Sequence, residues 1–155
     1  MADNLLDDGL IDDVIAGKAT PPGEFNLLVI DDDNVQRTII SRIGAQAGFT
    51  VEAAETFEAA SGFLHSLRFD CVTLDLGLGD RSGALLLPVI AQVGYRLPVI
   101  VVSGASQQML DATAVMSHAL QIESEVLTKP LNLPRLREQL ARIRMQAMAR
   151  ARQSA

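Results

Sequence analysis

The amino-acid sequence predicts an α/β domain with a doubly wound, five-stranded parallel sheet and helices on both faces. From Phe25 onward, short apolar runs alternate with segments in which apolar residues recur three and four positions apart, and five such pairs can be counted. The runs at 70–75 and 98–103 are almost continuously apolar, as expected of central strands buried on both faces. This alternation indicates a parallel sheet that helices cover on each side.

Each apolar run predicts a strand, and the segment between one run and the next predicts a helix. The strands are predicted at 26–31, 50–54, 70–75, 98–103 and 124–128, with helices between them and after Lys129. The second run, Val51-Glu52-Ala53, is mixed in polarity, so its strand is expected at an edge of the sheet. The helix after the first strand has an apolar stripe formed by Val35, Ile39, Ile40 and Ile43.

Two residues are expected to start helices. Thr56 can cap the helix after the second strand, and Asn132 can cap the last helix, which has Pro134 in its first turn. The residues that the helices are expected to bury are Phe57, Phe63, Leu64, Met109, Met116, Leu136, Leu140 and Ile143.

The two ends of the chain have opposite charges. Residues 1–24 hold six acids against Lys18, and residues 131–155 hold six arginines against Glu138. We therefore divide the chain into an acidic leader at 1–23, one domain at 24–146 and a basic extension of the last helix at 147–155. Apolar residues in the leader have helical spacing, and the break at 20–23 separates it from the domain. The acidic leader is thus a candidate to dock on the arginine-rich helix.

Composition excludes several classes of protein. A net charge of -6 argues against general nucleic-acid binding. The single cysteine, Cys71, lies in an apolar run, which excludes an internal disulfide and is compatible with a reducing compartment. The N-terminus is acidic, and no run approaches the roughly 20 apolar residues of a membrane span. A soluble cytoplasmic protein is expected.

Reactive side chains follow four of the predicted strands. Asp31 ends the first strand and Asp32 and Asp33 follow it, the third and fourth strands end at Asp75 and Ser103, and Lys129 follows the fifth. In open parallel sheets, ligands bind outside the carboxyl ends of the strands. Clustered carboxylates favour a hard cation such as Mg2+, which clamps phosphoryl oxygens, and one carboxylate can then act as a nucleophile.

Together these segments resemble the receiver domain of two-component response regulators, typified by the chemotaxis regulator, over residues 25–145. The resemblance implies a flavodoxin-like strand order 2-1-3-4-5. The segments that carry it are Leu28-Val29-Ile30-Asp31-Asp32-Asp33, Leu74-Asp75-Leu76-Gly77-Leu78-Gly79 with Gly83 eight residues past Asp75, Val102-Ser103-Gly104 and Leu127-Thr128-Lys129-Pro130.

The resemblance implies a role for each matched residue. Asp75 would be the phosphoacceptor. Mg2+, for which Mn2+ could substitute, would be held by Asp31, Asp32, Asp75 and the backbone carbonyl of Gly77. The phosphoryl group would be bound by Ser103, which is also the switch residue, and by Lys129, with Gly104 leaving the entrance open and Pro130 following a cis peptide bond.

Two positions depart from the family pattern. Gly79 stands where the family usually has proline. Val126 occupies the position where many receivers have an inward-turning Tyr or Phe. An aromatic switch is therefore not expected.

The function that follows is a stand-alone phosphoacceptor receiver, not an enzyme beyond its own Mg2+-dependent phosphorylation and dephosphorylation. Its partners would be a histidine kinase or a histidine phosphotransfer protein and a downstream protein, and a homodimer is compatible with the sequence. Two alternatives stay open. A haloacid-dehalogenase-type phosphatase would use Asp31 as its nucleophile, and a pseudo-receiver would keep only the fold as a docking module.

Overall fold

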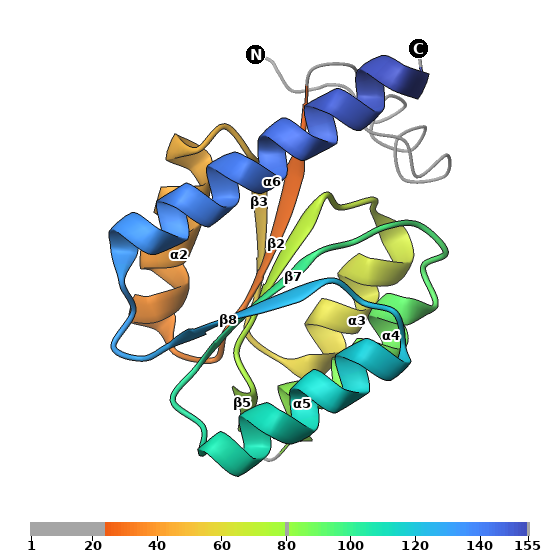
Figure 1. Ribbon diagram of the computed structural model, residues 1–155. Helices are drawn as coiled ribbons and strands as arrows, with labels where there is room; N and C mark the ends of the chain where they lie inside the picture. Colours follow the sequence, from red (N-terminus) through yellow and green to blue (C-terminus); the bar gives the residue numbers. More distant parts are fainter. Residues whose placement is uncertain (1–23, 80, 155) are drawn as a thin grey trace.

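The computed structural model describes residues 24–79 and 81–154 (Figure 1). The predicted acidic leader at 1–23 lies outside the described residues. Within them, none of the helices combines the length and the apolar character that crossing a bilayer requires.

Five parallel strands form the central sheet in the order β3-β2-β4-β7-β8. Numbered along the chain, this is the predicted order 2-1-3-4-5. The strands also lie where the apolar runs placed them. Their bounds are β2 Asn26–Ile30, β3 Thr50–Ala54, β4 Cys71–Leu74, β7 Val99–Ser103 and β8 Ser124–Thr128.

Burial of the strands follows their place in the sheet. All residues of β4 and β7 are buried, which confirms them as central strands, and the mixed strand β3 lies at one edge. In the register of β2 and β4, Ile30 lies opposite Leu74. The residues that follow these two strands, Asp31 and Asp75, therefore leave the sheet side by side.

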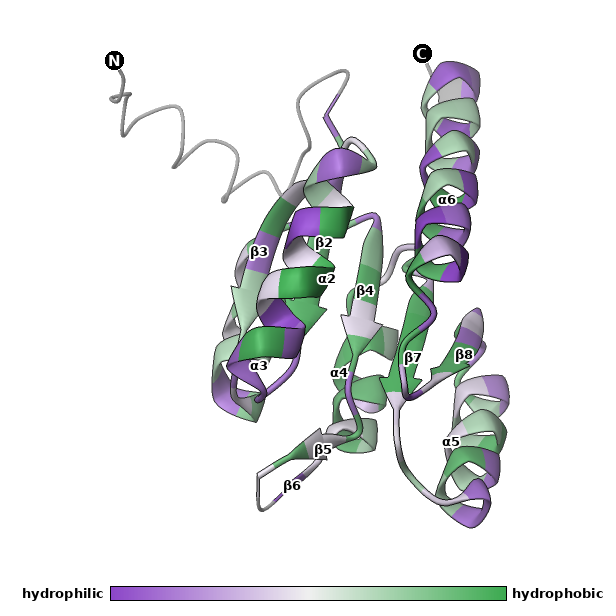
Figure 2. Ribbon diagram, turned by 90° about the vertical axis from the view of Figure 1, so that its left-hand side faces the viewer, coloured by the Kyte–Doolittle hydropathy of each residue, from purple (hydrophilic) through white to green (hydrophobic). Residues whose placement is uncertain are grey.

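Helices cover both faces of the sheet, and a separate apolar core lies under each group (Figures 1 and 2). On one face lie α2 (Asn34–Gln46) and α6 (Leu133–Ser154), which enclose Leu27, Val29 and Ile100. On the other face lie α3 (Phe57–Ser66), α4 (Leu87–Ala91) and α5 (Gln107–Ala119). The doubly wound architecture is thereby confirmed.

Polar side chains begin α2, α3 and α6 by accepting hydrogen bonds from free backbone N–H groups. Thr56 accepts from Ala59 N at the start of α3, as predicted. The predicted cap Asn132 likewise accepts from Arg135 N at the start of α6. Asp33 caps α2, so this third aspartate has a structural role.

The predicted apolar stripe of α2 is wrong for two residues. Ile40 and Ile43 are buried, but Val35 is 67% exposed and Ile39 36% exposed. The rotation of the helix is fixed at Gly44, where an added Cβ would lie 2.4 Å from Leu27 Cδ2. This close approach turns the side of α2 that carries Val35 and Ile39 towards solvent.

Methionine burial is predicted correctly for one helix position and not for another. Met116 of α5 packs against the core, whereas Met109 in the first turn of that helix is 42% exposed. In this turn it is the next residue, Leu110, that is buried in the core. Met109 instead lines the opening described below.

A short hairpin follows β4 and was not predicted. Its strands are β5 (Gly77–Leu78) and β6 (Arg81–Ser82), and the 3-10 turn η1 (Gly83–Leu86) leads from them into α4. The hairpin is attached to α3, because the Arg81 guanidinium lies 3.1 Å from the Glu58 carboxylate and 4.6 Å from the centre of the Phe57 ring.

The last helix runs unbroken through residue 146. Ala147 is buried in the core under α6, which also contains Phe25. The division of the chain at 146 stays a prediction.

Candidate functional site

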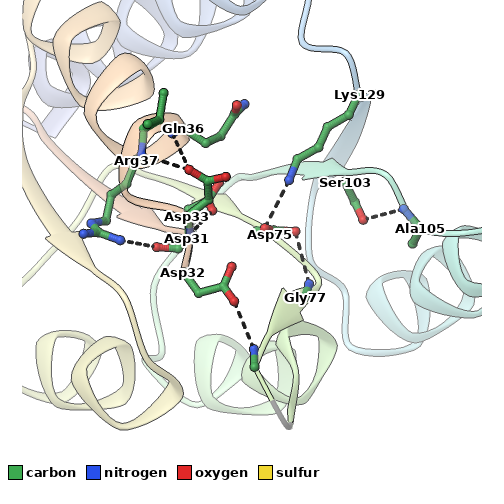
Figure 3. A network of polar contacts seen from close by, with 12 residues as sticks. Asp31, Asp32, Asp33, Gln36, Arg37, Asp75, Gly77, Ser103, Ala105 and Lys129 are labelled. Atoms are coloured by element: carbon green, nitrogen blue, oxygen red, sulfur yellow. Dashed lines mark hydrogen bonds and ion pairs between the residues drawn. The ribbon is translucent and has the colours of Figure 1, made fainter.

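Three carboxylates meet at the carboxyl rim of the sheet (Figure 3). Asp31 and Asp32 follow β2, and Asp75 follows the adjacent strand β4. Each offers one oxygen, and these oxygens lie within 4.8 Å of one another. The parallel register of the two strands therefore produces the cluster.

The three carboxyl groups differ in their surroundings. Asp31 is 1% exposed and Asp75 6% exposed, whereas Asp32 is open to solvent. Asp31 Oδ1 accepts a hydrogen bond from Asp33 N at 2.9 Å. Burial, and to a smaller extent the Asp75 charge, raise the pKa of Asp31 to about 6, although the Asp33 N–H and Lys129 act in the opposite direction.

The arrangement fits a divalent cation. Asp31 Oδ2 is buried and has no hydrogen-bond partner among the residues that the structure describes. A buried oxygen of this kind normally has a partner, either in the protein or in an ion or water molecule. Several carboxylate oxygens in one place form a donor set that Mg2+, Ca2+ or Mn2+ can use.

Asp75 is held at both of its oxygens. Oδ1 accepts from Gly77 N at 3.1 Å, and Oδ2 lies 3.3 Å from Lys129 Nζ. Lys129 follows β8, and the peptide bond between Lys129 and Pro130 is cis. Lys129 thus places a positive charge next to the Asp75 carboxylate.

Ser103, the last residue of β7, contributes a buried hydroxyl to the same rim. Its Oγ accepts a hydrogen bond from Ala105 N at 3.0 Å. The loop between β7 and α5 is therefore fastened to the serine side chain. A ligand that forms a hydrogen bond with the Ser103 hydroxyl could therefore change the position of this loop.

The site opens to solvent through a cavity of about 440 Å3. Small residues from two loops line much of it, and a Cβ added at Gly104 would lie 3.8 Å from Lys129, an ordinary contact distance. Met109 is the exposed long apolar side chain at this mouth. The predicted site residues among those lining the cavity are Asp32, Asp75, Gly77, Ser103, Gly104 and Lys129, and Gly79 also lines it.

Val126 lies near the middle of the edge strand β8 and is 37% exposed. The side chain at this position is aliphatic and not aromatic. The structure therefore offers no aromatic rotation there that could respond to the site.

Two backbone contacts around the cluster are not obvious from sequence. Arg37 Nη1 donates to the carbonyl oxygen of Asp31 at 2.8 Å, which ties α2 to the loop that carries two of the acids. Gly83 lies so close to Asp75 that an added Cβ would be 2.1 Å from its carbonyl oxygen. Gly83 belongs to the motif noted above, whereas the only signal for Arg37 was its place one helical turn after the cap Asp33.

A family model described as response regulator receiver domain matches residues 27–141, about three quarters of the chain. The chain belongs to this family. The observed strand order is thus that of a receiver domain, as the sequence resemblance implied. The family match gives no support to the phosphatase alternative, which leaves Asp75 without a role.

Curated relatives of this receiver domain are response regulators. The transcriptional regulatory protein DltR of Streptococcus agalactiae is 30% identical over 132 residues, which cover 84% of this chain and 53% of DltR. The transcriptional regulatory protein ZraR of Salmonella typhimurium is 27% identical over 118 residues, which cover 76% of this chain and 26% of ZraR. The chain thus spans about half or less of the length of these relatives.

Solved receiver structures show the same fold. The signal receiver domain of an HD domain-containing protein from Pseudomonas fluorescens gives a TM-score of 0.71 at 22% identity, covering 88% of this chain and 98% of that one. A Burkholderia pseudomallei response regulator was solved with a phosphorylated aspartic acid, a calcium ion and citrate. It gives a TM-score of 0.64 at 24% identity, and the match covers 82% of this chain and 75% of that one.

Proposed function

We propose that this receiver domain accepts a phosphoryl group on Asp75 from a phosphohistidine of a kinase or phosphotransfer protein. The observation that carries the proposal is the environment of the Asp75 carboxylate. It faces two further acids on one side and the Lys129 ammonium on the other, at the bottom of an open cavity. A nucleophile, a cation site and a fixed positive charge are the parts that phosphoryl transfer requires.

The transfer proposed here exchanges one bond for another. A carboxylate oxygen of Asp75 forms a bond to phosphorus while the phosphorus–nitrogen bond of the donor histidine breaks, and the imidazole leaves with its electron pair. Mg2+ or Mn2+, when bound, would neutralise charge on the phosphoryl oxygens. Asp31, Asp32, Asp75 and the carbonyl of Gly77 are the groups that would hold it.

The residues around Asp75 then have distinct tasks. Lys129 would pair with the added phosphoryl charge, which amounts to about -1.5 to -2 at neutral pH. The Ser103 hydroxyl would donate a hydrogen bond to a phosphoryl oxygen. The same hydroxyl accepts a hydrogen bond from Ala105 N in the unphosphorylated structure. Water entering through the open mouth would later hydrolyse the acyl phosphate and restore the carboxylate.

The proposed output is a change in affinity for a downstream protein. Because Val126 is a small, partly exposed side chain, the change would run through the Ser103–Ala105 loop and α5. Lys129→Ala should keep the fold and uncouple phosphorylation from this response. Equal partner binding by the phosphorylated wild type and the phosphorylated variant would contradict that coupling.

The proposal is tested by intact mass spectrometry after incubation with acetyl phosphate, with and without Mg2+. Wild type should gain one phosphoryl group only with Mg2+, Asp75→Asn should gain none, and Asp31→Asn should lose only part of the labelling. Asp33→Asn is the matched control, because it removes a neighbouring carboxylate that caps α2. An adduct on Asp75→Asn would overturn the assignment, and no adduct on any variant would favour a pseudo-receiver.

A further inference from the structure

The solvent face of α6 is a basic surface with a narrow apolar stripe. Leu136, Leu140 and Ile143 turn inward and are buried. On the outer side, Ala141, Met145 and Ala149 follow one another at intervals of four residues and are exposed, Met145 by 68%. Residues four apart lie on one face of a helix. The exposed arginines of α6 are Arg135, Arg137, Arg142 and Arg152.

The charge of this surface argues against a second copy of α6 as its partner. Residues 133–154 contain six arginines and one glutamate, so two such helices side by side would repel. Among the exposed arginines, Arg142 pairs with Glu125 of β8. The fitting partner is an acidic segment with its own apolar stripe.

An acidic segment of the same chain is attached through Glu24 to Phe25, which lies beside α6. Phe25, the second described residue, is buried in the core that also contains Ala147 and Met148, and the Arg144 guanidinium lies 5.5 Å from the centre of its ring. Residues 1–23 therefore join the domain next to the C-terminal half of α6. Their attachment point brings them to this surface at a high effective concentration.

The sequence of residues 1–23 matches the surface in pattern as well as in charge. Leu6, Leu10 and Val14 have the spacing of four that Ala141, Met145 and Ala149 have on α6. Four aspartates flank them, at 7, 8, 12 and 13. A helix of 22 residues is about 33 Å long, which is long enough to accept a helix formed by residues 4–17.

We propose that residues 1–23 dock along the exposed face of α6 in the same chain, with the apolar stripes in contact and the aspartates beside the arginines. The leader would then shield the basic face of α6, and a partner that binds there would have to displace it. This inference does not depend on phosphorylation of Asp75.

The test uses paramagnetic relaxation in the full chain. Cys71 is fully buried, and burial raises the pKa of its thiol, so a spin label will react at a single engineered cysteine. Glu138→Cys places the label on the outer face of α6, away from the attachment point at Phe25. Ala114→Cys, at an exposed position of α5 on the other side of the sheet, is the control.

With the label at 138, amide signals of residues 5–14 should broaden at low salt, and they should recover in about 1 M NaCl, where charges farther apart than about 3 Å are screened. With the label at 114 they should stay sharp. Met145→Asp should release the leader, whereas Val115→Asp, at an equally exposed apolar position on α5, should not. Equal broadening from both labels would overturn the proposal. So would broadening that appears only between a labelled copy and an isotope-enriched one.

Discussion

Replacing Asp31 by asparagine should stabilise the metal-free protein at neutral pH. The Asp31 carboxyl is buried, one of its oxygens has no partner in the described residues, and Asp75 and Asp32 lie close by. The pKa of about 6 in the folded chain, against the ordinary 3.8, corresponds to about 3 kcal/mol at neutral pH. Asparagine removes this charge and keeps an oxygen that accepts from Asp33 N.

The sign of the pH dependence follows from the raised pKa of Asp31. Folding favours the protonated acid, so its contribution to stability is fully present below pH 3.8 and is lost as the pH rises through about 6. The advantage of Asp31→Asn should therefore be small below pH 3.8, grow between there and pH 6, and level off at higher pH. At the plateau we expect a gain of about 1–3 kcal/mol, because the new amide must still find acceptors.

The assay is urea unfolding of the metal-free protein followed by far-UV circular dichroism, since the chain has no tryptophan. With a slope of about 2 kcal/mol per molar urea, a gain of 3 kcal/mol moves the midpoint by about 1.5 M. Asp33→Asn is the control: it makes the same charge change, and asparagine caps helices as well as aspartate does. A variant less stable than wild type at pH 7.5, or one with the same advantage at pH 3.5, would refute the reasoning.

Mg2+ should offset most of this difference in stability. At a concentration 100 times its dissociation constant, a bound cation stabilises the folded chain by about 2.7 kcal/mol. Wild type should gain this amount, and Asp31→Asn, which lacks a charged ligand, should gain much less at the same concentration. Equal gains in the two proteins would show that the cation binds elsewhere.

Further predictions concern Gly83 and Arg37, which contact the backbone of the site, and Gly62 of α3 as a comparison. Gly83→Ala should destabilise the chain by about 2 kcal/mol or more, because its Cβ would meet the Asp75 carbonyl oxygen at 2.1 Å. Gly62→Ala, at an exposed position within α3 with open space around it, should instead stabilise by about 1 kcal/mol in the same urea assay. Arg37→Gln should weaken Mg2+ binding about tenfold, because the guanidinium positions the loop of the two acids. Calorimetric titration would measure this affinity against Arg42→Gln on the same helix, and equal affinities would contradict the positioning role.

The rim of the site could be predicted because parallel strands bring their carboxyl ends to one edge. Once five apolar runs had been recognised, the residues after them had to lie together, whatever the helices between them did. The pairing of Ile30 with Leu74 then places Asp31 beside Asp75. The common rim needed only the pattern of apolar runs, whereas the neighbouring positions of the first and third strands came from the strand order that the family resemblance implied.

The failures lie where tertiary packing decides. The spacing of apolar residues in α2 does not reveal that the close contact between Gly44 and Leu27 fixes the helix rotation, which leaves Val35 exposed. The β5–β6 hairpin has only two residues in each strand, too few for an alternating pattern, and the Arg81 contacts with α3 help to hold it. Such contacts join segments far apart in the sequence.

The clustered acids that destabilise the metal-free fold also make the site respond to a bound cation or phosphoryl group. Within residues 24–79 and 81–154, a buried oxygen of Asp31 has no hydrogen-bond partner, and three carboxylates lie within reach of one cation. A cation removes that penalty only in the folded state, so its binding energy acts on the fold as well as on the ligand. The proposed phosphorylation of Asp75 would add negative charge beside the Lys129 ammonium, and the lysine would then divide its interaction between the phosphoryl group and the Asp75 carboxyl oxygens. Adding a cation or a phosphoryl group would therefore change the contacts of the site. The loop between β7 and α5, which Ser103 holds through Ala105 N, is the nearest element that can move in response.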